Sequence, residues 1–288
     1  RGLGDVYKRQ GIMITVIFTC FNRREKTLQC MKSLSGGNKD LAFRYVIVDD
    51  NSTDGTYEAL EDLKRSGMTI DVLRGTGNLF WAGGMRKGIA YAKENTDSDY
   101  YLLVNDDVDF MPEAISKMIQ TLQDKKLGYQ KDTVLVGPMC DKNGTFSYGG
   151  IRYQNGIHYA EVKPSDEERR CDSFNMNCLL LPKHVFMEIP NFDEHYIHSL
   201  ADFDYGLEMK RRGIPMYVYH EYVGVCPDND LKGGWSDTSL SRLERLKKKE
   251  SIKGAPFKPW FYFLKKNFGW TQALLHGFTP YVRIMLGK

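Results

Sequence analysis

The sequence contains no Cys-x-x-Cys pair and no His-Glu-x-x-His motif among its six cysteines and six histidines. Zinc-ribbon, thioredoxin-like and zincin classes therefore have no support, and the cysteines are expected to be reduced core residues. No run approaches the roughly 20 apolar residues that span a bilayer, so we expect no transmembrane helix. The first ten residues, RGLGDVYKRQ, lack the apolar core of a secretory signal and read as a translated-adapter remnant. We therefore expect a natural start near Met13 and a cytoplasmic protein.

A broad cationic face is also missing, although the net charge is +3. The positive excess lies in residues 242–288, with eleven Lys and Arg against two Asp and Glu, whereas residues 11–241 are net acidic. This distribution argues against a protein that binds nucleic acid through a wide basic surface. An acidic body suits the binding of a metal ion, and a basic end suits contact with an anionic surface.

Apolar runs alternate with helical patterns along the chain. Its length of 288 residues is enough for one large domain or two small ones. This alternation predicts an α/β fold with a mostly parallel, Rossmann-like central sheet and helices on both faces. Ligands of such sheets gather at the carboxyl ends of the strands. Between the last strands, residues 140–175 predict irregular hairpins. The expected strands are 12–18, 45–48, 68–73, 100–104, 134–136, 179–181 and 216–219, and the expected helices are 22–34 with Asn22 as its cap, 57–66 with Gly67 after it, 85–92, 112–122 and 202–211.

An acidic segment, DDNSTDG, runs from Asp49 to Gly55 directly after the expected strand at 45–48. Side-chain oxygens in such a segment can cap the next helix, which explains one or two of its residues. Two adjacent carboxylates at a strand end can instead accept hydrogen bonds from a nucleotide base or from ribose hydroxyls. Both interpretations remain open at this level.

A second acidic segment, Asn105-Asp106-Asp107, follows the expected strand at 100–104. Adjacent carboxylates repel each other unless a cation or strong donors neutralise them. Hard oxygen ligands with room for phosphate oxygens suit Mg²⁺ or Mn²⁺. The alternative is a polar loop that solvates its own charges, which is less attractive when two such segments lie at neighbouring strand ends.

Together these segments resemble the family 2 glycosyltransferases, which have the GT-A fold. The resemblance covers roughly residues 12–225, and the motifs follow the family's order and spacing. The loop that begins at Asn78 is most similar to rhamnosyltransferase-type bacterial members. The motifs are TCFNR at 19–23, VDDNSTDG at 48–55, NLFWAGG at 78–84, Asn105-Asp106-Asp107 as a form of the DxD motif, and ADFD at 201–204.

The resemblance implies roles for these positions. Asp202 matches the general base of the inverting class, with Ala201 where a Glu is usual. Asp107, helped by Asp106, would bind a divalent Mn²⁺ or Mg²⁺ that bridges the donor's diphosphate. The nucleotide-sugar donor would contact Thr19, Phe21, Arg23, Asp49, Asp50, Asn78, Trp81, Gly83, Gly84 and Asp106, and the acceptor would contact Asn177, His198 and Asp204.

Several of these residues also have structural interpretations. The glycines Gly83 and Gly84 either let the backbone approach the sugar or form a tight turn before a helix. The ring of Trp81 either stacks on a sugar or anchors its loop in the core. Within the ADFD motif, Asp204 is the alternative to Asp202 as the base.

The implied activity is inverting, metal-dependent transfer of a hexosyl-type sugar from a nucleotide-diphospho-sugar to a hydroxyl of a glycan or a lipid-linked acceptor, as in bacterial surface polysaccharide synthesis. A nucleotidyltransferase acting on sugar phosphates is a second interpretation. That class has a glycine-rich loop after its first strand, where this chain has TCFNRR at 19–24. A non-catalytic sugar-binding module is a third, but Asp50, Asp107 and Asp202 are all retained.

The expected organisation is a catalytic domain over 11–232 and a basic, aromatic appendage over 233–288. The nucleotide-sugar half would end near residue 137 and the acceptor half would follow. In the appendage, either the WFYF run at 260–263 packs on the catalytic domain, or its rings and the neighbouring lysines dock on an anionic membrane. Pro256 and Pro259 predict two short helical segments there rather than one rod.

Overall fold

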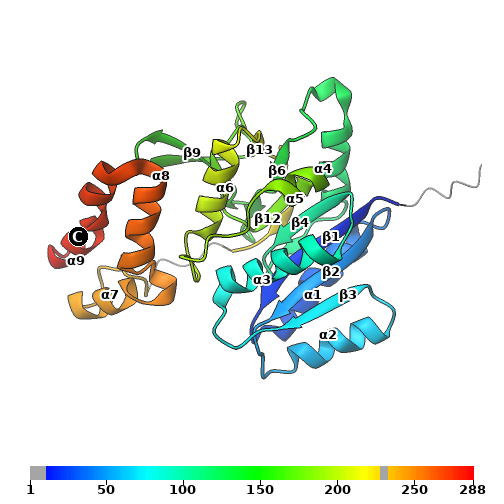
Figure 1. Cartoon of the computed structure of the whole chain (residues 1–288), viewed down its shortest axis with the longest axis horizontal. Coiled ribbons are helices and arrows are strands. Elements are labelled where there is room, and N and C mark those ends of the chain that lie inside the picture. Colours follow the sequence, from blue (N-terminus) through cyan, green and yellow to red (C-terminus); the bar gives the residue numbers. More distant parts are fainter. Residues whose placement is uncertain (1–10, 228–232) are drawn as a thin grey trace, which may run out of the picture.

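A seven-stranded sheet forms the centre of the protein in the computed structural model, which describes residues 11–227 and 233–288 (Figure 1). Its strands are β1 (Met13–Cys20), β2 (Ala42–Asp49), β3 (Ile70–Arg74), β4 (Tyr100–Val104), β6 (Val134–Val136), β12 (Cys178–Pro182) and β13 (Met216–Val218). The order across the sheet is β13-β6-β12-β4-β1-β2-β3, and only β12 runs against its two neighbours. The predicted mostly parallel sheet is confirmed. The expectation for residues 1–10 lies outside the described residues.

Helices cover both faces of this sheet because successive strand side chains point to opposite sides. In β1, Ile14, Val16 and Phe18 join one buried cluster, whereas Ile17 joins the other. One face is covered by α1 (Arg24–Gly37), α2 (Thr56–Arg65) and α4 (Ala114–Gln123), and the other by α3 (Phe80–Asn95), α5 (Lys183–Glu188) and α6 (Ala201–Arg211).

Two small sheets and a short 3₁₀ helix fill the stretches between these elements. The predicted hairpins at 140–175 are confirmed, since most of the small strands lie there. The six cysteines are free and buried, as expected of core residues. The first small sheet is β10 (His158–Val162), β9 (Gly150–Asn155) and β11 (Ser173–Phe174); the second is β5 (Asp109–Phe110), β14 (Gly224–Val225), β7 (Met139–Cys140) and β8 (Phe146–Tyr148); the 3₁₀ helix is η1 (Lys125–Leu127).

The last part of the chain is helical and packs beside α6, shown in orange and red in Figure 1. Its elements are α7 (Arg242–Lys249), η2 (Ile252–Gly254), α8 (Phe257–Gly277) and α9 (Thr279–Met285). Phe263, Leu264 and Ala273 of α8 are buried in the same cluster as α3, α5 and α6. α8 bends at Gly269, whose φ of +88° is one that residues with a side chain rarely adopt. Among the described residues, no helix combines the length and apolarity needed to cross a membrane.

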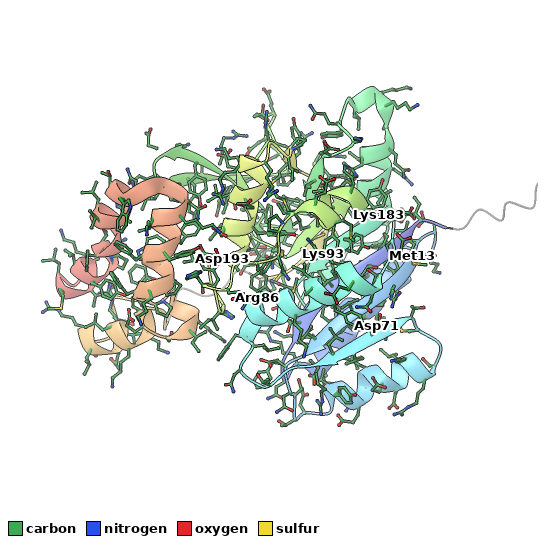
Figure 2. All side chains as sticks on the ribbon, viewed as in Figure 1. Met13, Asp71, Arg86, Lys93, Lys183 and Asp193 are labelled. Carbon is green, nitrogen blue, oxygen red and sulfur yellow. The ribbon has the colours of Figure 1, made fainter. Side chains whose placement is uncertain are left out.

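Three polar contacts to two carboxylates, Asp193 and Asp204, fasten α8 to the part of the chain before it. The Asp193 carboxylate accepts hydrogen bonds from Tyr262 and Lys266 of α8, both at 2.8 Å. The backbone carbonyl of the same Asp193 accepts from Arg86 of α3 at 3.0 Å, and both residues are labelled in Figure 2. Asp204 of α6 accepts from Lys266 at 2.7 Å. The rings at 260–263 therefore belong to a packed interface.

Two local predictions are wrong. Asn22 does not cap a helix: α1 begins at Arg24, and the Asn22 side chain accepts the Thr53 N–H at 2.8 Å, which joins the loops after β1 and β2. The glycines at 83 and 84 lie inside α3 rather than in a loop before it. The predicted break between two helical segments is confirmed, since α7 ends at Lys249 and α8 begins after Pro256. Pro259 lies in the first turn of α8, where its missing N–H would have no helical partner.

Candidate active site

The carboxyl ends of β1, β2 and β4 lie side by side, which brings the two acidic segments to one edge of the sheet. Cys20 at the end of β1 is paired with Asp49 at the end of β2. The next residue, Asp50, donates its N–H to the Cys20 carbonyl at 2.9 Å. β4 is the other neighbour of β1 and leads directly into Asn105. The sequence predicted that the candidate site residues lie at this edge of the sheet.

At the end of β2, the Asp49 carboxylate is fully buried and already bound. It accepts a hydrogen bond from Arg74 at the end of β3 at 2.7 Å and from the Ser52 N–H at 3.3 Å. The guanidinium of Arg74 also lies 3.9 Å from the ring centroid of Tyr57. Asp49 therefore ties the ends of β2 and β3 together.

Asp50 organises the loop between β3 and α3. Its two carboxylate oxygens accept backbone N–H groups of Gly77 at 2.8 Å, Leu79 at 2.9 Å and Phe80 at 3.1 Å. A side chain at Gly75 would collide with this carboxylate, since an added Cβ would lie 2.3 Å from Asp50 Oδ1. The structure thus gives Asp50 a loop-shaping role, which the sequence pattern did not indicate.

The other expected donor contacts divide into buried and exposed groups. Thr19 is buried and donates to the Val48 carbonyl at 3.0 Å, and a Cβ on Gly84 would lie 2.2 Å from its Oγ1. The role of Gly84 is therefore the close packing of α3 on β1, and Gly83 is buried beside it. Phe21 is half exposed and Asn78 is exposed, so both side chains are accessible to a ligand.

At the end of β4, a single arginine bridges the acidic pair. Arg23 Nη1 lies 3.2 Å from Asp106 Oδ1 and 3.0 Å from Asp107 Oδ2. Asp106 is buried and also accepts from Thr27 Oγ1 at 3.2 Å. Burial raises the pKa of Asp106 to about 6, although Arg23 offsets part of the shift. Asp107 is more open to solvent, with about a quarter of its side chain exposed (26%).

Trp81 anchors the first residue of this segment. Its indole Nε1 donates to Asn105 Oδ1 at 2.9 Å, and its ring lies 5.6 Å from that of Phe192. This contact supports the anchoring interpretation of Trp81 and leaves the sugar-stacking one untested. It also fixes the Asn105 side chain, so Asp107 is the more available oxygen donor.

The two acidic residues of the ADFD motif have opposite surroundings. Asp204 is buried and bound by Lys266 at 2.7 Å, Asn267 at 2.9 Å and Tyr196 at 3.2 Å. The structure therefore places Asp204 in the α6–α8 interface, where these three donors occupy its carboxylate, and its expected contact with the acceptor stays a prediction. Asp202, by contrast, has no ion pair with any described residue.

Backbone groups hold Asp202 at the start of α6. It accepts the Phe203 N–H at 2.9 Å and the Met176 N–H at 3.4 Å. Burial raises the pKa of Asp202 to about 6, against the lowering effect of these two hydrogen bonds. A carboxylate whose pKa lies near neutrality is suited to accept a proton during catalysis.

The start of β12 connects Asp202 to the acidic segment after β4. Met176 binds Asp202, and its neighbour Asn177 accepts the Asn105 N–H through its carbonyl at 3.3 Å. The buried Asn177 side chain donates to Cys226 Sγ at 3.4 Å, and this sulfur lies 3.8 Å from Asp107 Oδ1. Cys226 is the site neighbour that the sequence did not predict, because no motif surrounds it.

His198 lines a cavity of about 450 Å³ between the loop before α6 and the segment that leads into α8. Ile197, Ile252, Pro256 and Pro259 give this cavity apolar walls. The His198 Nδ1 atom is buried and has no hydrogen-bond partner among the described residues. Burial lowers its pKa to about 4, and the positive charges of Lys253 and Arg23 add to the effect.

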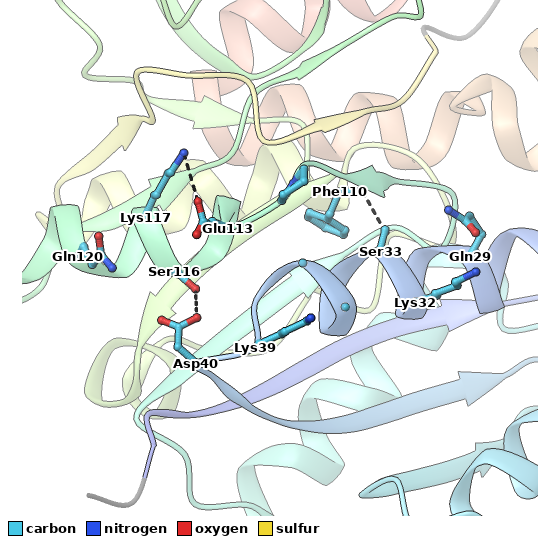
Figure 3. Close-up of a pocket in the computed structure, with 13 residues that line it drawn as sticks. Gln29, Lys32, Ser33, Lys39, Asp40, Phe110, Glu113, Ser116, Lys117 and Gln120 are labelled. Carbon is cyan, nitrogen blue, oxygen red and sulfur yellow. Dashed lines mark hydrogen bonds and ion pairs between the residues drawn. The ribbon is translucent and has the colours of Figure 1, made fainter.

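A larger cavity, of about 750 Å³, lies elsewhere, between α1 and α4 (Figure 3). None of the predicted site residues lines it. Asp40 accepts from Ser116 at 2.6 Å, and Lys117 lies 3.9 Å from Glu113, so both of its acidic groups are already partnered. Its position and lining do not connect it to the chemistry at the strand ends.

Comparison with known proteins assigns the chain to a family. Residues 15–176, more than half of the chain, match Glycosyl transferase family 2. A dolichol-phosphate mannosyltransferase of Pyrococcus furiosus is 24% identical over 110 residues, which are 38% of this chain and 30% of that protein. The match therefore spans less than a third of this relative's length.

Solved structures share the fold at low sequence identity. A mannosyltransferase from Pyrobaculum calidifontis, in complex with GDP-Man and Mn²⁺, has a TM-score of 0.54 at 13% identity, covering 95% of this chain and 73% of that one. Residues 1–349 of S. aureus TarS give 0.54 at 16% identity, covering 95% and 81%. GalNAc-T7 with UDP, GalNAc and Mn²⁺ gives 0.56 at 10% identity, covering 80% and 49%. The chain belongs to glycosyltransferase family 2 and has the GT-A-like α/β fold of these proteins.

Proposed function

We propose that the protein is an inverting glycosyltransferase that moves a hexosyl-type sugar from a nucleotide-diphospho-sugar to a hydroxyl acceptor. One observation carries the proposal. Within one turn of α6, the Asp204 carboxylate is neutralised by Lys266 of α8, whereas the Asp202 carboxylate has no cation of the described residues beside it. Family membership over residues 15–176 supports the donor class. The nucleotidyltransferase and sugar-binding-module interpretations have no comparable support in these contacts.

In this mechanism Asp202 takes the proton from the acceptor hydroxyl as its oxygen attacks the anomeric carbon. One base suffices for an inverting displacement, since the nucleotide diphosphate leaves from the opposite side of the sugar. Burial keeps the pKa of Asp202 at about 6, so the base is ionised at neutral pH yet basic enough to accept the proton. The backbone N–H groups of Met176 and Phe203 hold its oxygens in position.

A divalent metal fits the acidic segment after β4. The described residues contain no cluster of three or more His, Cys, Asp and Glu groups that could hold a metal alone. Mg²⁺ typically binds through one or two carboxylates together with substrate phosphates, and Asp107 with Asp106 supplies that number. The pair already binds a cation, the Arg23 guanidinium. When bound, the metal would stabilise the negative charge of the departing diphosphate.

The donor and acceptor would approach from different parts of the chain. We assign the donor side to residues 11–137, with the half-exposed Phe21 and the exposed Asn78 available for contact. We assign the acceptor side to residues 138–232, where Asn177 and His198 lie, together with the segment before α8 that closes the His198 cavity. Its apolar walls suit a glycan carried on a lipid, as in bacterial surface polysaccharide synthesis.

A donor screen tests this proposal. Nucleotide-sugars with GDP, UDP and dTDP are added with Mn²⁺ or Mg²⁺, and the melting temperature is measured, since a bound ligand stabilises the folded state. We expect one nucleotide class to raise it, and transfer to be lost when the metal is chelated. Asp202→Asn should keep the shift and lose transfer, with Asp204→Asn as the matched control. Pyrophosphate release from a nucleoside triphosphate and a sugar phosphate would instead identify a nucleotidyltransferase.

A further inference from the structure

An apolar stripe runs along the outside of the last two helices. Trp270, Leu274, Phe278, Val282 and Leu286 are spaced by four residues, and each is between 52% and 62% exposed. Phe278 has helical backbone angles, and its carbonyl accepts the Val282 N–H at 3.0 Å, so the helical path continues from α8 into α9. Residues four apart lie on one side of a helix. These five side chains, the outer stripe, therefore form a continuous band that winds gradually around the helix, because each step of four residues exceeds one turn of 3.6 residues.

The outer stripe borders the face that packs on the protein, since the ring of Phe278 lies 5.1 Å from that of Phe257 and the ring of Trp270 lies 6.3 Å from that of Phe261. Leu264, Ala273 and Ile284 are buried on the inner side, where the Trp260 indole donates to the His276 carbonyl at 3.2 Å. A Cβ on Gly277 would lie 2.8 Å from the Phe261 ring, which shows how tightly this side is packed. The large apolar side chains that are most exposed in the described residues gather on these last helices. An apolar surface of this kind indicates a binding partner.

The segment that carries the stripe has charges of one sign, although Glu250 before it accepts a hydrogen bond from Tyr281 of α9. Residues 251–288 contain six Lys and Arg and no Asp or Glu. Lys266 is neutralised by Asp193 and Asp204, but Lys265 and Arg283 are exposed and form no ion pair with a described residue. Lys265 Nζ lies 4.2 Å from the Trp270 ring centroid, so a cation adjoins the start of the stripe. A second copy of this chain would oppose like charges, whereas an anionic surface complements them.

We propose that the outer stripe docks on an anionic lipid bilayer. The apolar side chains enter the headgroup layer, and Lys265 and Arg283 contact the lipid phosphates beside them. This surface differs from the WFYF run at 260–263, because those rings face the catalytic part and are not free to insert. The proposal does not depend on the reaction, since docking requires neither a donor nor an acceptor.

Flotation with vesicles tests the proposal. The full chain is mixed with vesicles of phosphatidylcholine alone or with about 30 mol% phosphatidylglycerol, at about 0.05 M and about 0.5 M salt, which changes the screening length severalfold. We expect flotation with the anionic vesicles that falls at least about tenfold at high salt. No flotation with anionic vesicles at low salt, or equal flotation with both vesicle types, overturns the proposal.

Matched variants locate the surface. The triple variant L274S/F278S/V282S and the double variant K265E/R283E should each reduce flotation about tenfold or more while leaving the melting temperature unchanged. The controls L127S/M187S and K125E/K126E alter exposed residues of the same kinds elsewhere and should float as the unchanged protein does. Unchanged flotation of the triple variant overturns the proposal. So does a concentration-dependent dimer that this variant abolishes while no vesicles are bound, because the stripe would then join two copies.

Discussion

The ends of β2 and β4 carry acidic pairs that look alike in the sequence but differ in their surroundings. At the end of β2, Asp49 and Asp50 accept hydrogen bonds from Arg74 and from backbone N–H groups of two loops. At the end of β4, Asp106 and Asp107 share the single Arg23 guanidinium, and Asp107 remains partly exposed. A carboxylate whose hydrogen bonds are all made within the chain holds the loops in place. A partly exposed carboxylate such as Asp107 is accessible to a ligand.

The same contrast recurs within α6. Asp204 is bound by three side chains, two of them from α8, whereas Asp202 is bound by backbone N–H groups alone. Two residues apart on a helix, the side chains point in different directions. The partners of each carboxylate, more than its motif, therefore distinguish Asp204 from Asp202, the base in our proposal.

The largest expected effect is that of Asp202→Asn. The amide keeps the shape of the side chain but cannot accept the proton, so turnover should fall by about 10²–10⁴-fold. The melting temperature should not fall, because a buried ionisable group is replaced by a neutral one. Turnover and melting curves are measured together with those of Asp204→Asn, which should lower stability and keep turnover per folded molecule. The reverse pattern would mean that Asp204 is the base.

Asp107→Asn comes next. Loss of the open carboxylate should lower turnover by about 10²–10³-fold, the usual cost of removing one group that stabilises developing charge. Titration with Mn²⁺ should show weaker metal binding, seen as a higher Mn²⁺ concentration at half-maximal rate. Asp109→Asn is the control, since Asp109 lies nearby but only accepts from Gln29 at 3.1 Å. If Asp107→Asn turned over as fast as the unchanged protein while the metal was chelated, Asp107 would not be a metal ligand.

Asp50→Asn should act on stability instead. An amide has one acceptor oxygen where the carboxylate serves three N–H groups, so the free energy of unfolding should fall by about 2–3 kcal/mol. Denaturant unfolding measures it, with the exposed Glu58→Gln as a control that changes stability by less than about 0.5 kcal/mol. If Asp50→Asn kept its stability but no longer bound the nucleotide-sugar, Asp50 would contact the donor instead of stabilising the loop.

The smallest effect is on pH dependence. Burial raises the pKa of Asp202 to about 6, and the base is active only when ionised. The value of kcat/KM should therefore fall about tenfold per pH unit below pH 6, and level off above it. Asp106 has a similar pKa, so the profile is repeated with Asp106→Asn, in which the acidic limb should persist. A limb near pH 4 would contradict the raised pKa of Asp202.

Much of the fold and of the site's location could be read from the residues alone. Alternating β-branched runs and helical patterns predicted the parallel sheet, and acidic residues directly after strands predicted the edge that carries the site. Gly84 shows the limit: its sequence neighbours indicate a flexible loop, but the structure uses the missing side chain to pack α3 on Thr19. Such a contact joins residues far apart in the chain, and no local pattern encodes it.

The sequence by itself determined the element order, the acidic strand ends and the wholly basic charge of residues 251–288, because periodicity and composition are local properties. Only the tertiary structure decided which carboxylates are free. Lys266 reaches Asp204 from a helix some sixty residues away, and Arg23 after β1 reaches Asp107 after the neighbouring strand β4. It also decided which apolar side chains of α8 are buried and which form the outer stripe, because the bend at Gly269 sets their directions. Folding brings together residues that are far apart in the chain, and these contacts decide which side chains are bound or buried and which stay accessible.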